Sequence, residues 1–460
     1  LISRDRLGKK TIYYHLDAQQ KSLFMSSEVK GILTGCQKRF RLDPQSIFRF
    51  LTQSITDDTL KTFFQDIKAF PPGCFALIDI TQPQIEPEWK RYWTLPFESG
   101  EQAPKVAPAG WQTTLRDLLF DSVRLRLRSD VPIGILLSGG LDSTSILAGA
   151  VAAGHGNIQT FSVISDNPNH NEETFARAAV EFFNVPSYFV NIDHDPLLLF
   201  AKLKRLNWVN DQPTPSMAML AHQSVMEVAS RKGFKVLLTG QASDEQLGGY
   251  NKLLYCYLYS LILNGKIIEA VTTAVKFGIN RTVFQEFSLP EARRYLPFLR
   301  KRGLHRHLGE FLIHSEASST GLRKDYSEVE FLELTQFSLP QLLHYEDRMS
   351  MSCGIEMRVP FVDYRLMEFI GKLPDNLKFR EGWTKYALRE SMFGHIPEQI
   401  RLRRDKKGFN IPEQEWLRGV LRTAAEDLLS GDPLIERAEI MGRKQAIAAY
   451  RNWAAGGTTF

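Results

Sequence analysis

The central part of the chain alternates short apolar runs with longer stretches of helical periodicity. Unbroken, branched apolar runs of four to eight residues are typical of parallel strands that are covered on both faces. Strands are predicted at residues 131–137, 158–163, 187–192 and 236–240, and helices at 144–151 and 172–183. This alternation predicts an α/β fold with a doubly wound parallel sheet, in which ligands bind beyond the carboxyl ends of the strands.

The regions on either side of this alternation have different patterns. Residues 11–14 and 22–25 predict a β-hairpin, and residues 111–128 predict a helix with one apolar face. Beyond about residue 250 strand signals nearly vanish, which predicts a helical C-terminal extension. Residues 98–110 are rich in proline, glycine and small side chains, so we place a domain boundary between residues 107 and 108.

Composition narrows the class of protein. The 460 residues are 43% hydrophobic and 24% charged, which is ordinary for a globular protein of two or three domains. The net charge of +5 is too small to suggest a nucleic-acid partner. The four cysteines lack zinc or disulfide spacing, and no apolar run is long enough to span a bilayer. We therefore expect a cytoplasmic protein without nucleic-acid or membrane partners.

A turn of sequence Ser-Gly-Gly-Leu-Asp-Ser, residues 138–143, joins the first strand to its helix. Its glycines let the backbone approach a ligand, its serines supply hydroxyl groups, and the helix start presents free N–H groups. These features predict a cradle for a polyanionic phosphate group. Asp142 would repel phosphate unless a cation lay between them, so we expect Asp142 to bind Mg²⁺.

This turn resembles the pyrophosphate loop of ATP pyrophosphatases, and the surrounding chain resembles the glutamine-dependent asparagine synthetase family. Three further segments follow the family's order, at residues 239–250, 344–363 and 382–409. The resemblance implies cleavage of ATP to AMP and pyrophosphate, with ATP and Mg²⁺ as cofactors. It also implies that Asp142 and Asp244 bring two carboxylates to the metal, which would neutralise charge as pyrophosphate leaves.

The same resemblance assigns the remaining site residues. Glu356 is expected to face the substrate amine, Lys385 the pyrophosphate and Lys406 the acyl adenylate. A fixed ammonium at Lys406 would stabilise the oxyanion that develops as ammonia attacks. The nucleotide is expected to contact Leu137, Ser138, Gly139, Gly140, Asp142, Ser143, Val163, Thr239, Gly240 and Gln241.

Residues 4–8 and 27–30 resemble the closing segments of the family's N-terminal glutaminase domain, which has an α/β/β/α fold and an N-terminal cysteine nucleophile. The resemblance divides the chain into a remnant of that domain at residues 1–107 and an ATP-pyrophosphatase synthetase domain at residues 108–460. The nucleophile and the glutamine ligands would precede Leu1. We therefore expect a fragment that uses ammonia, whereas the intact protein would use glutamine.

The sequence thus predicts ATP-dependent amidation of aspartate to asparagine through aspartyl-AMP. The expected partners are small molecules, namely aspartate, ATP and ammonia or glutamine, and a homodimer stays open. Two departures bear on the substrate: Gln241 stands where many members carry glutamate, and Ala242 replaces the commoner glycine. An alternative is a related amidotransferase that acts on another carboxylate, such as a surface-sugar uronic acid, or that closes a lactam or peptide ring.

Gln241 weighs against ring closure. β-Lactam-forming relatives carry a tyrosine at this position that helps to deprotonate a tethered amine, whereas an amide side chain cannot act as a base. Free ammonia needs no such deprotonation before it attacks. A nucleotide-binding regulatory protein without catalysis is the alternative from another class, but pure binding would need neither Glu356 nor Lys406.

Overall fold

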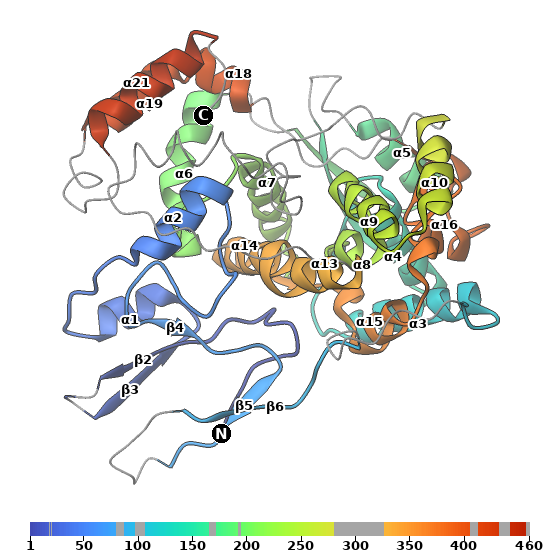
Figure 1. Ribbon diagram of the computed structural model, residues 1–460, viewed down its shortest axis with the longest axis horizontal. Coiled ribbons are helices and arrows are strands. Elements are labelled where there is room, and N and C mark those ends of the chain that lie inside the picture. The colour runs from blue at the N-terminus through green and yellow to red at the C-terminus, as the bar shows by residue number, and fades with distance from the viewer. Residues whose placement is uncertain are drawn as a thin grey trace.

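The computed structural model describes most of the chain and shows a central α/β region beside a smaller N-terminal part (Figure 1). The helix α14 (Leu339–Ser352) lies between the two. The described residues are 1–17, 19, 21–79, 87–96, 106–164, 172–191, 195–279, 326–404, 413–431 and 442–456.

The centre of the fold is a five-stranded sheet in which every neighbouring pair is parallel, as the sequence predicted. The strand order is β11-β10-β7-β8-β9. Its strands are β7 (Ile133–Leu136), β8 (Gln159–Ile164), β9 (Ser187–Asn191), β10 (Val236–Leu238) and β11 (Glu356–Arg358). The edge strand β11 was not predicted, because a three-residue segment of sequence Glu-Met-Arg has a single buried apolar side chain and shows no readable pattern.

The order of the strands creates a switch point. From β7 the chain moves outward through β8 to β9, then returns to the other side of β7 to form β10 and β11. The connections therefore diverge between β7 and β10. In open parallel sheets this divergence opens a crevice at the carboxyl ends of the two strands, where ligands bind.

Alternate residues of the strands enter two separate cores, so the sheet is covered on both faces. Ile135 and Leu238 pack into one core with Leu119 of α3 and Ile146 of α4. Leu136 and Leu237 pack into the other core, together with residues of α7 and α14. The helices around the sheet are α3 (Trp111–Arg126), α4 (Leu141–Ala152), α5 (Glu173–Phe183), α6 (Pro196–Asn210), α7 (Ala218–Arg231) and α8 (Ser243–Leu247).

Beyond residue 250 the described chain is mainly helical, as expected, with β11 and a short antiparallel pair, β12 (Phe379–Arg380) and β13 (Trp383–Thr384), as exceptions. The α-helices, besides α14, are α9 (Asn251–Leu263), α10 (Ile267–Ile279), α13 (Tyr326–Leu332), α15 (Tyr364–Gly371), α16 (Tyr386–Ser391), α17 (Glu398–Arg401), α18 (Glu413–Arg418), α19 (Arg422–Gly431) and α21 (Arg443–Ala454). A π-helical turn, η3 (Glu333–Phe337), and two 3₁₀ turns, η4 (Pro360–Val362) and η5 (Asp375–Leu377), complete the extension.

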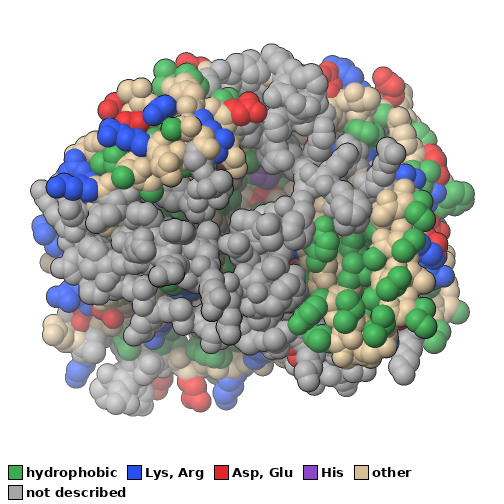
Figure 2. Space-filling view, turned by 45° about the horizontal axis from the view of Figure 1, so that its top comes forward, with side chains coloured by type: hydrophobic (Ala, Val, Ile, Leu, Met, Phe, Trp, Pro, Cys, Tyr) green, Lys and Arg blue, Asp and Glu red, His purple; other side chains and the backbone are tan. Residues whose placement is uncertain are grey.

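Exposed hydrophobic side chains gather on α9 and α10, where Ile268 is 82% and Ile279 75% exposed (Figure 2). A search of the described residues finds no helix with the length and apolar character that a membrane span requires.

The N-terminal part contains two small antiparallel sheets, ordered β3-β2-β4 and β1-β5-β6. The predicted hairpin is present, with Tyr13 opposite Ser26 and Asp17 opposite Ser22. Its elements are β1 (Ile2–Ser3), β2 (Tyr13–Asp17), β3 (Ser22–Ser26), α1 (Val29–Gly35), α2 (Pro44–Gln53), β4 (Lys68–Ala69), β5 (Cys74–Ala76) and β6 (Trp89–Arg91).

Candidate active site

The turn between β7 and α4 is held in shape by its own serines. The Ser143 hydroxyl accepts from the Ser138 backbone N–H at 3.2 Å and lies 3.1 Å from the Ser138 hydroxyl. The Ser138 hydroxyl in turn accepts from the N–H of Gly140 at 3.2 Å. Gly139 has φ +70°, and a Cβ there would lie 2.3 Å from the backbone nitrogen of Ala176. Glycine is therefore required at position 139 by both backbone conformation and packing.

Asp142 and Asp244 meet at the switch point, although they lie about a hundred residues apart in the sequence. The ammonium of Lys385 lies between them, with its Nζ 2.6 Å from each carboxylate oxygen of Asp142 and 2.6 Å from Oδ1 of Asp244. Burial disfavours the charged form of Lys385, but the two aspartates outweigh burial and raise its pKa. We call Asp142, Asp244 and Lys385 the carboxylate cluster.

Three neighbours that the sequence did not single out shape the carboxylate cluster. The Ser243 hydroxyl donates to Oδ1 of Asp142 at 2.7 Å. A Cβ at Gly249 would lie 1.8 Å from Oδ1 of Asp244 and 2.3 Å from Cε of Lys385. Arg389 is buried, which lowers its pKa to about 10, and the charge of Asp142 acts against that shift. Ser243 and Gly249 both belong to the segment 239–250 that carries the family resemblance. Membership of this segment is the sequence feature that could have predicted their place in the site.

The two aspartates fit a magnesium ion. Mg²⁺ is usually held by one or two carboxylates together with the phosphates of its substrate. The side chains of Asp142 and Asp244 are 19% and 16% exposed, so a nucleotide can reach them. The Lys385 ammonium stands where a cation between two carboxylates would lie. Within the described residues, no group of three or more His, Cys, Asp or Glu side chains is arranged to hold a metal.

The residues expected to contact the nucleotide flank the carboxylate cluster on neighbouring strands. Leu137 follows β7, and its N–H donates to the carbonyl of Phe161 on β8 at 2.8 Å. Val163 lies near the carboxyl end of β8. Thr239 and Gly240 follow β10, and a Cβ at Gly240 would lie 2.9 Å from Cβ of Asp142. The chain thus places these residues at one edge of the sheet, with Gln241 next along the turn.

Glu356 is not brought to the carboxylate cluster. It lies at the amino end of β11, level with Val236, whereas the phosphate turn leaves the carboxyl end of β7. Its side chain is 46% exposed and accepts from Nε of Arg358 at 2.9 Å. That hydrogen bond lowers the pKa of Glu356, which makes it a weaker base. Lys406 lies outside the described residues, so its predicted role is not placed.

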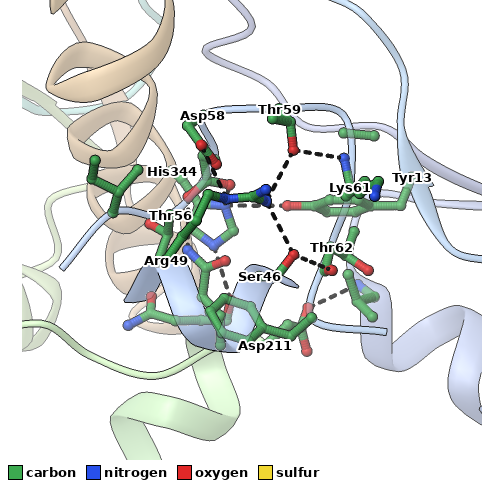
Figure 3. Close-up of a pocket in the computed structure, with 17 residues that line it drawn as sticks. Tyr13, Ser46, Arg49, Thr56, Asp58, Thr59, Lys61, Thr62, Asp211 and His344 are labelled. Carbon is green, nitrogen blue, oxygen red and sulfur yellow. Dashed lines mark hydrogen bonds and ion pairs between the residues drawn. The ribbon is translucent and has the colours of Figure 1, made fainter. Parts of the chain in front are cut away.

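A second cluster of buried ionisable groups joins the N-terminal part to α14. His344 lies with Nε2 2.9 Å from the carbonyl of Asn210 and Nδ1 3.1 Å from Oδ1 of Asp57. Carbonyl and carboxylate oxygens accept hydrogen bonds, so this arrangement favours a ring that is protonated on both nitrogens. Burial opposes this charge, but Asp57 outweighs burial and raises the pKa of His344. Figure 3 shows Tyr13 facing His344, and their side chains lie 3.1 Å apart.

Tyr13, Asp57 and His344 line a pocket (Figure 3). Around this pocket, groups of opposite charge lie within short distances of one another. Arg49 of α2 lies 3.1 Å from Asp58 and donates to the hydroxyls of Ser46 and Thr59 (Figure 3). Further along α14, Asp347 lies 2.5 Å from both Lys10 and Arg348, and Arg348 also lies 3.1 Å from Glu28. We call Asp57, His344, Lys10, Asp347, Arg348 and Glu28 the α14 interface.

Comparisons with known proteins cover nearly the whole chain. An asparagine synthetase (glutamine-hydrolysing) of Bacillus subtilis is 25% identical over 445 residues, which are 93% of this chain and 68% of the relative. The amidase chyE of Penicillium rubens is 26% identical over 493 residues, covering 94% of this chain and 70% of the relative. A solved structure, NMN synthetase from Francisella tularensis, is 21% identical and covers 32% of this chain and 60% of that chain, with a TM-score of 0.23, too low to support an argument.

Two family matches account for the two parts of the chain. Residues 1–93 match the glutamine amidotransferase domain, and residues 114–459 match the asparagine synthase family. The second match supports ATP-dependent amidation of a carboxylate and implies the use of ATP. Since it spans three quarters of the sequence, the chain belongs to the asparagine synthase family.

Proposed function

We propose that this chain converts aspartate to asparagine through an aspartyl adenylate, releasing AMP and pyrophosphate. The observation that carries the proposal is the convergence of Asp142, Asp244 and Lys385 at the switch point of a parallel sheet. A carboxylate is a poor electrophile. Its attack on the α-phosphorus of ATP converts one of its oxygens into a good leaving group, which ammonia then displaces as AMP.

Each part of the site has a proposed task in the first step. The turn at residues 138–143 would bind the phosphates through its N–H groups and hydroxyls. Asp142 and Asp244 would hold Mg²⁺, which neutralises charge on the leaving pyrophosphate when it is bound. Lys385 and Arg389 would remain beside the pyrophosphate as fixed cations. Ser243, through its hydrogen bond, would keep Asp142 aimed at the metal.

Other assignments stay predictions within this proposal. The boundary at residues 107/108 would separate an N-terminal-nucleophile glutaminase part from the synthetase part, and it falls between the two family matches. Lys406 is proposed to stabilise the oxyanion of the second step. Glu356 is proposed to face the amine only if the substrate complex brings it closer, since its present partner is Arg358.

A second acceptor class is favoured by one observation: the amidase relative is about as similar to this chain as the asparagine synthetase is. The two candidates are separated by ATP–pyrophosphate exchange with aspartate, uronic acids and β-amino carboxylic acids as acceptors. We expect aspartate, Mg-ATP and ammonium to give asparagine, AMP and pyrophosphate in equal amounts. Exchange with a larger carboxylic acid but none with aspartate would replace asparagine synthesis by the second class.

Gln241 provides an internal check on the nitrogen donor. Because an amide cannot deprotonate an amine, a free base such as ammonia should be the attacking nucleophile. Gln241→Glu is then expected to keep activity within about tenfold, or about 1.4 kcal/mol. Assays with ammonium and with glutamine measure which nitrogen donor the chain uses. A loss of activity larger than tenfold in Gln241→Glu would contradict the proposed role of the amide.

A further inference from the structure

The phosphate turn, residues 138–143, rests on the first turn of α5. A Cβ at Gly139 would lie 2.3 Å from the backbone nitrogen of Ala176 and 2.5 Å from the carbonyl carbon of Phe175. The backbone of Gly139 is therefore in close contact with the backbone of α5. Because packed interiors transmit displacements, a shift of the start of α5 would also shift the phosphate turn.

A buried ion pair holds the start of α5 in place. Glu172 directly precedes α5, and its carbonyl accepts from the N–H groups of Phe175 and Ala176 at 3.1 and 3.2 Å. Its carboxylate accepts from Arg403 at 2.7 Å instead of capping α5. The Arg403 guanidinium also lies 4.1 Å from the centre of the Phe175 ring. Only 6% of the Arg403 side chain and 10% of the Glu172 side chain are exposed, so solvent screens this pair little.

The backbone just before Arg403 is tied to the loop that carries Lys385. Arg389 of α16 donates through Nη1 to the carbonyl of Arg401 and through Nε to the carbonyl of Thr384, the latter at 2.9 Å. Thr384 directly precedes Lys385 in the chain. One guanidinium therefore joins the loop of Lys385 to the backbone two residues before Arg403.

We propose that Arg403 and Glu172 are positioning residues for the phosphates of ATP, a role that rests on the proposed function. Residues 401–403 hold Glu172 at one end and the loop of Lys385 at the other, so they fix the phosphate turn relative to the Lys385 ammonium. Arg403 and Glu172 act through the contact of α5 with Gly139. A displaced turn would offer its N–H groups to phosphate at poor angles, and hydrogen bonds weaken steeply with such misalignment.

The test measures the Kd of Mg-ATP and the Kd of AMP by calorimetry in the wild type and in matched variants. Glu172→Met and Arg403→Met should each weaken Mg-ATP binding about tenfold, because the phosphate turn loses its support. AMP lacks the two outer phosphates, so its Kd should change by less than about twofold. An equal loss for both ligands would overturn the proposal, since it would show a general distortion of the nucleotide site.

Glu173→Met and Arg177→Met are the controls. They remove the neighbouring ion pair of α5, whose atoms lie 2.5 Å apart but whose side chains are 27% and 52% exposed, so it should contribute little. Both should keep the Kd of Mg-ATP within about twofold of the wild type. The double variant Glu172→Met/Arg403→Met should lose no more than about tenfold, because the two residues act as one pair. Losses that multiply to about a hundredfold would overturn the proposal.

A milder variant keeps the proposal falsifiable if the buried methionine variants do not fold. Glu172→Asp retains the charge but is shorter by one methylene, so it should weaken Mg-ATP binding about threefold, whereas Glu173→Asp should not. The midpoint of denaturant unfolding shows which variants are folded. A wild-type Kd for Mg-ATP in the folded Glu172 variants would overturn the proposal. A wild type that binds Mg-ATP but releases no pyrophosphate with any acceptor would instead refute the proposed function and leave this comparison intact.

Discussion

The carboxylate cluster and the α14 interface both bury opposite charges, but they arrange them differently. In the cluster, Asp142 and Asp244 from distant segments share a single ammonium, that of Lys385. At the α14 interface cations match carboxylates in number, since Lys10 and Arg348 lie against Asp347 and Glu28, and His344 lies against Asp57. Two carboxylates around one ammonium form a site that can accept another cation, whereas matched charges fix a contact. The difference distinguishes a candidate ligand site from a contact that holds the N-terminal part of the chain against α14.

The largest expected effect comes from removing one carboxylate of the cluster. Asp142→Asn and Asp244→Asn should each lower pyrophosphate release by about 10³-fold, or about 4 kcal/mol, because the metal would lose half of its protein ligands. The measurement is steady-state release of pyrophosphate at saturating acceptor. Asp427→Asn, on the exposed face of α19, is the control and should have no effect. Normal turnover in either cluster variant would refute the metal assignment.

The next prediction tests the space around the carboxylate cluster rather than its charge. Gly249→Ala would bring a methyl group to within 1.8 Å of Oδ1 of Asp244 and 2.3 Å of Cε of Lys385, so the carboxylate and the lysine must move. We expect about 100-fold less pyrophosphate release, or about 2.7 kcal/mol. Gly278→Ala lies in α10 with open space around its Cβ and should leave activity unchanged. Equal activities of the two variants would show that the site tolerates displacement of Asp244.

Part of the fold and of the candidate site could be predicted from the sequence. Apolar runs predicted the strands of the parallel sheet that are buried on both faces, and a turn of small residues predicted the phosphate cradle. A motif does not say at which end of a strand a residue lies, and Glu356 opens β11 and pairs with Arg358. Its expected place beside the substrate amine stays a prediction. The contact between Asp57 and His344 joins residues far apart in the sequence and depends on tertiary packing alone.

The pair of His344 and Asp57 at the α14 interface is tested by measuring stability as a function of pH. Since the folded-state pKa of His344 is raised, its contribution to stability is fully present below its unfolded value of about 6.5 and is lost as pH rises through the folded value. The pKa of Asp57 is lowered, since His344 outweighs its burial, so its contribution is lost as pH falls below about 4. The pair should therefore stabilise the fold most between about pH 4 and pH 6.5.

His344→Gln should lower the free energy of unfolding by about 2 kcal/mol at pH 6, with a smaller difference at pH 9. Denaturant unfolding at the two pH values measures this change. His155→Gln, at an exposed position, is the control and should show no such pH dependence. A difference between wild type and His344→Gln that is independent of pH would mean that the ring is not cationic.

The smallest expected effect concerns the backbone beside the carboxylate cluster. Ala242 has φ +72°, a conformation that glycine adopts without strain, and it precedes Ser243 and Asp244 at the start of α8. Ala242→Gly should stabilise the protein by about 1 kcal/mol, seen as a higher Tm. Ala148→Gly, in the interior of α4, should have the opposite sign at about the same size. A lower Tm for Ala242→Gly would show that its methyl group contributes more through packing than its backbone conformation costs.

The strand order also has a consequence for synthesis of the chain. Strand β10 ends at Leu238, but its partner β11 begins at Glu356, so about 118 residues must emerge from the ribosome before β10 is paired on that side. At about 5–20 residues per second, this edge stays open for roughly 6–24 s. An unpaired apolar edge strand can pair with other chains during that time. We therefore expect the nascent chain to depend on chaperones most strongly while the ribosome translates residues 239–355.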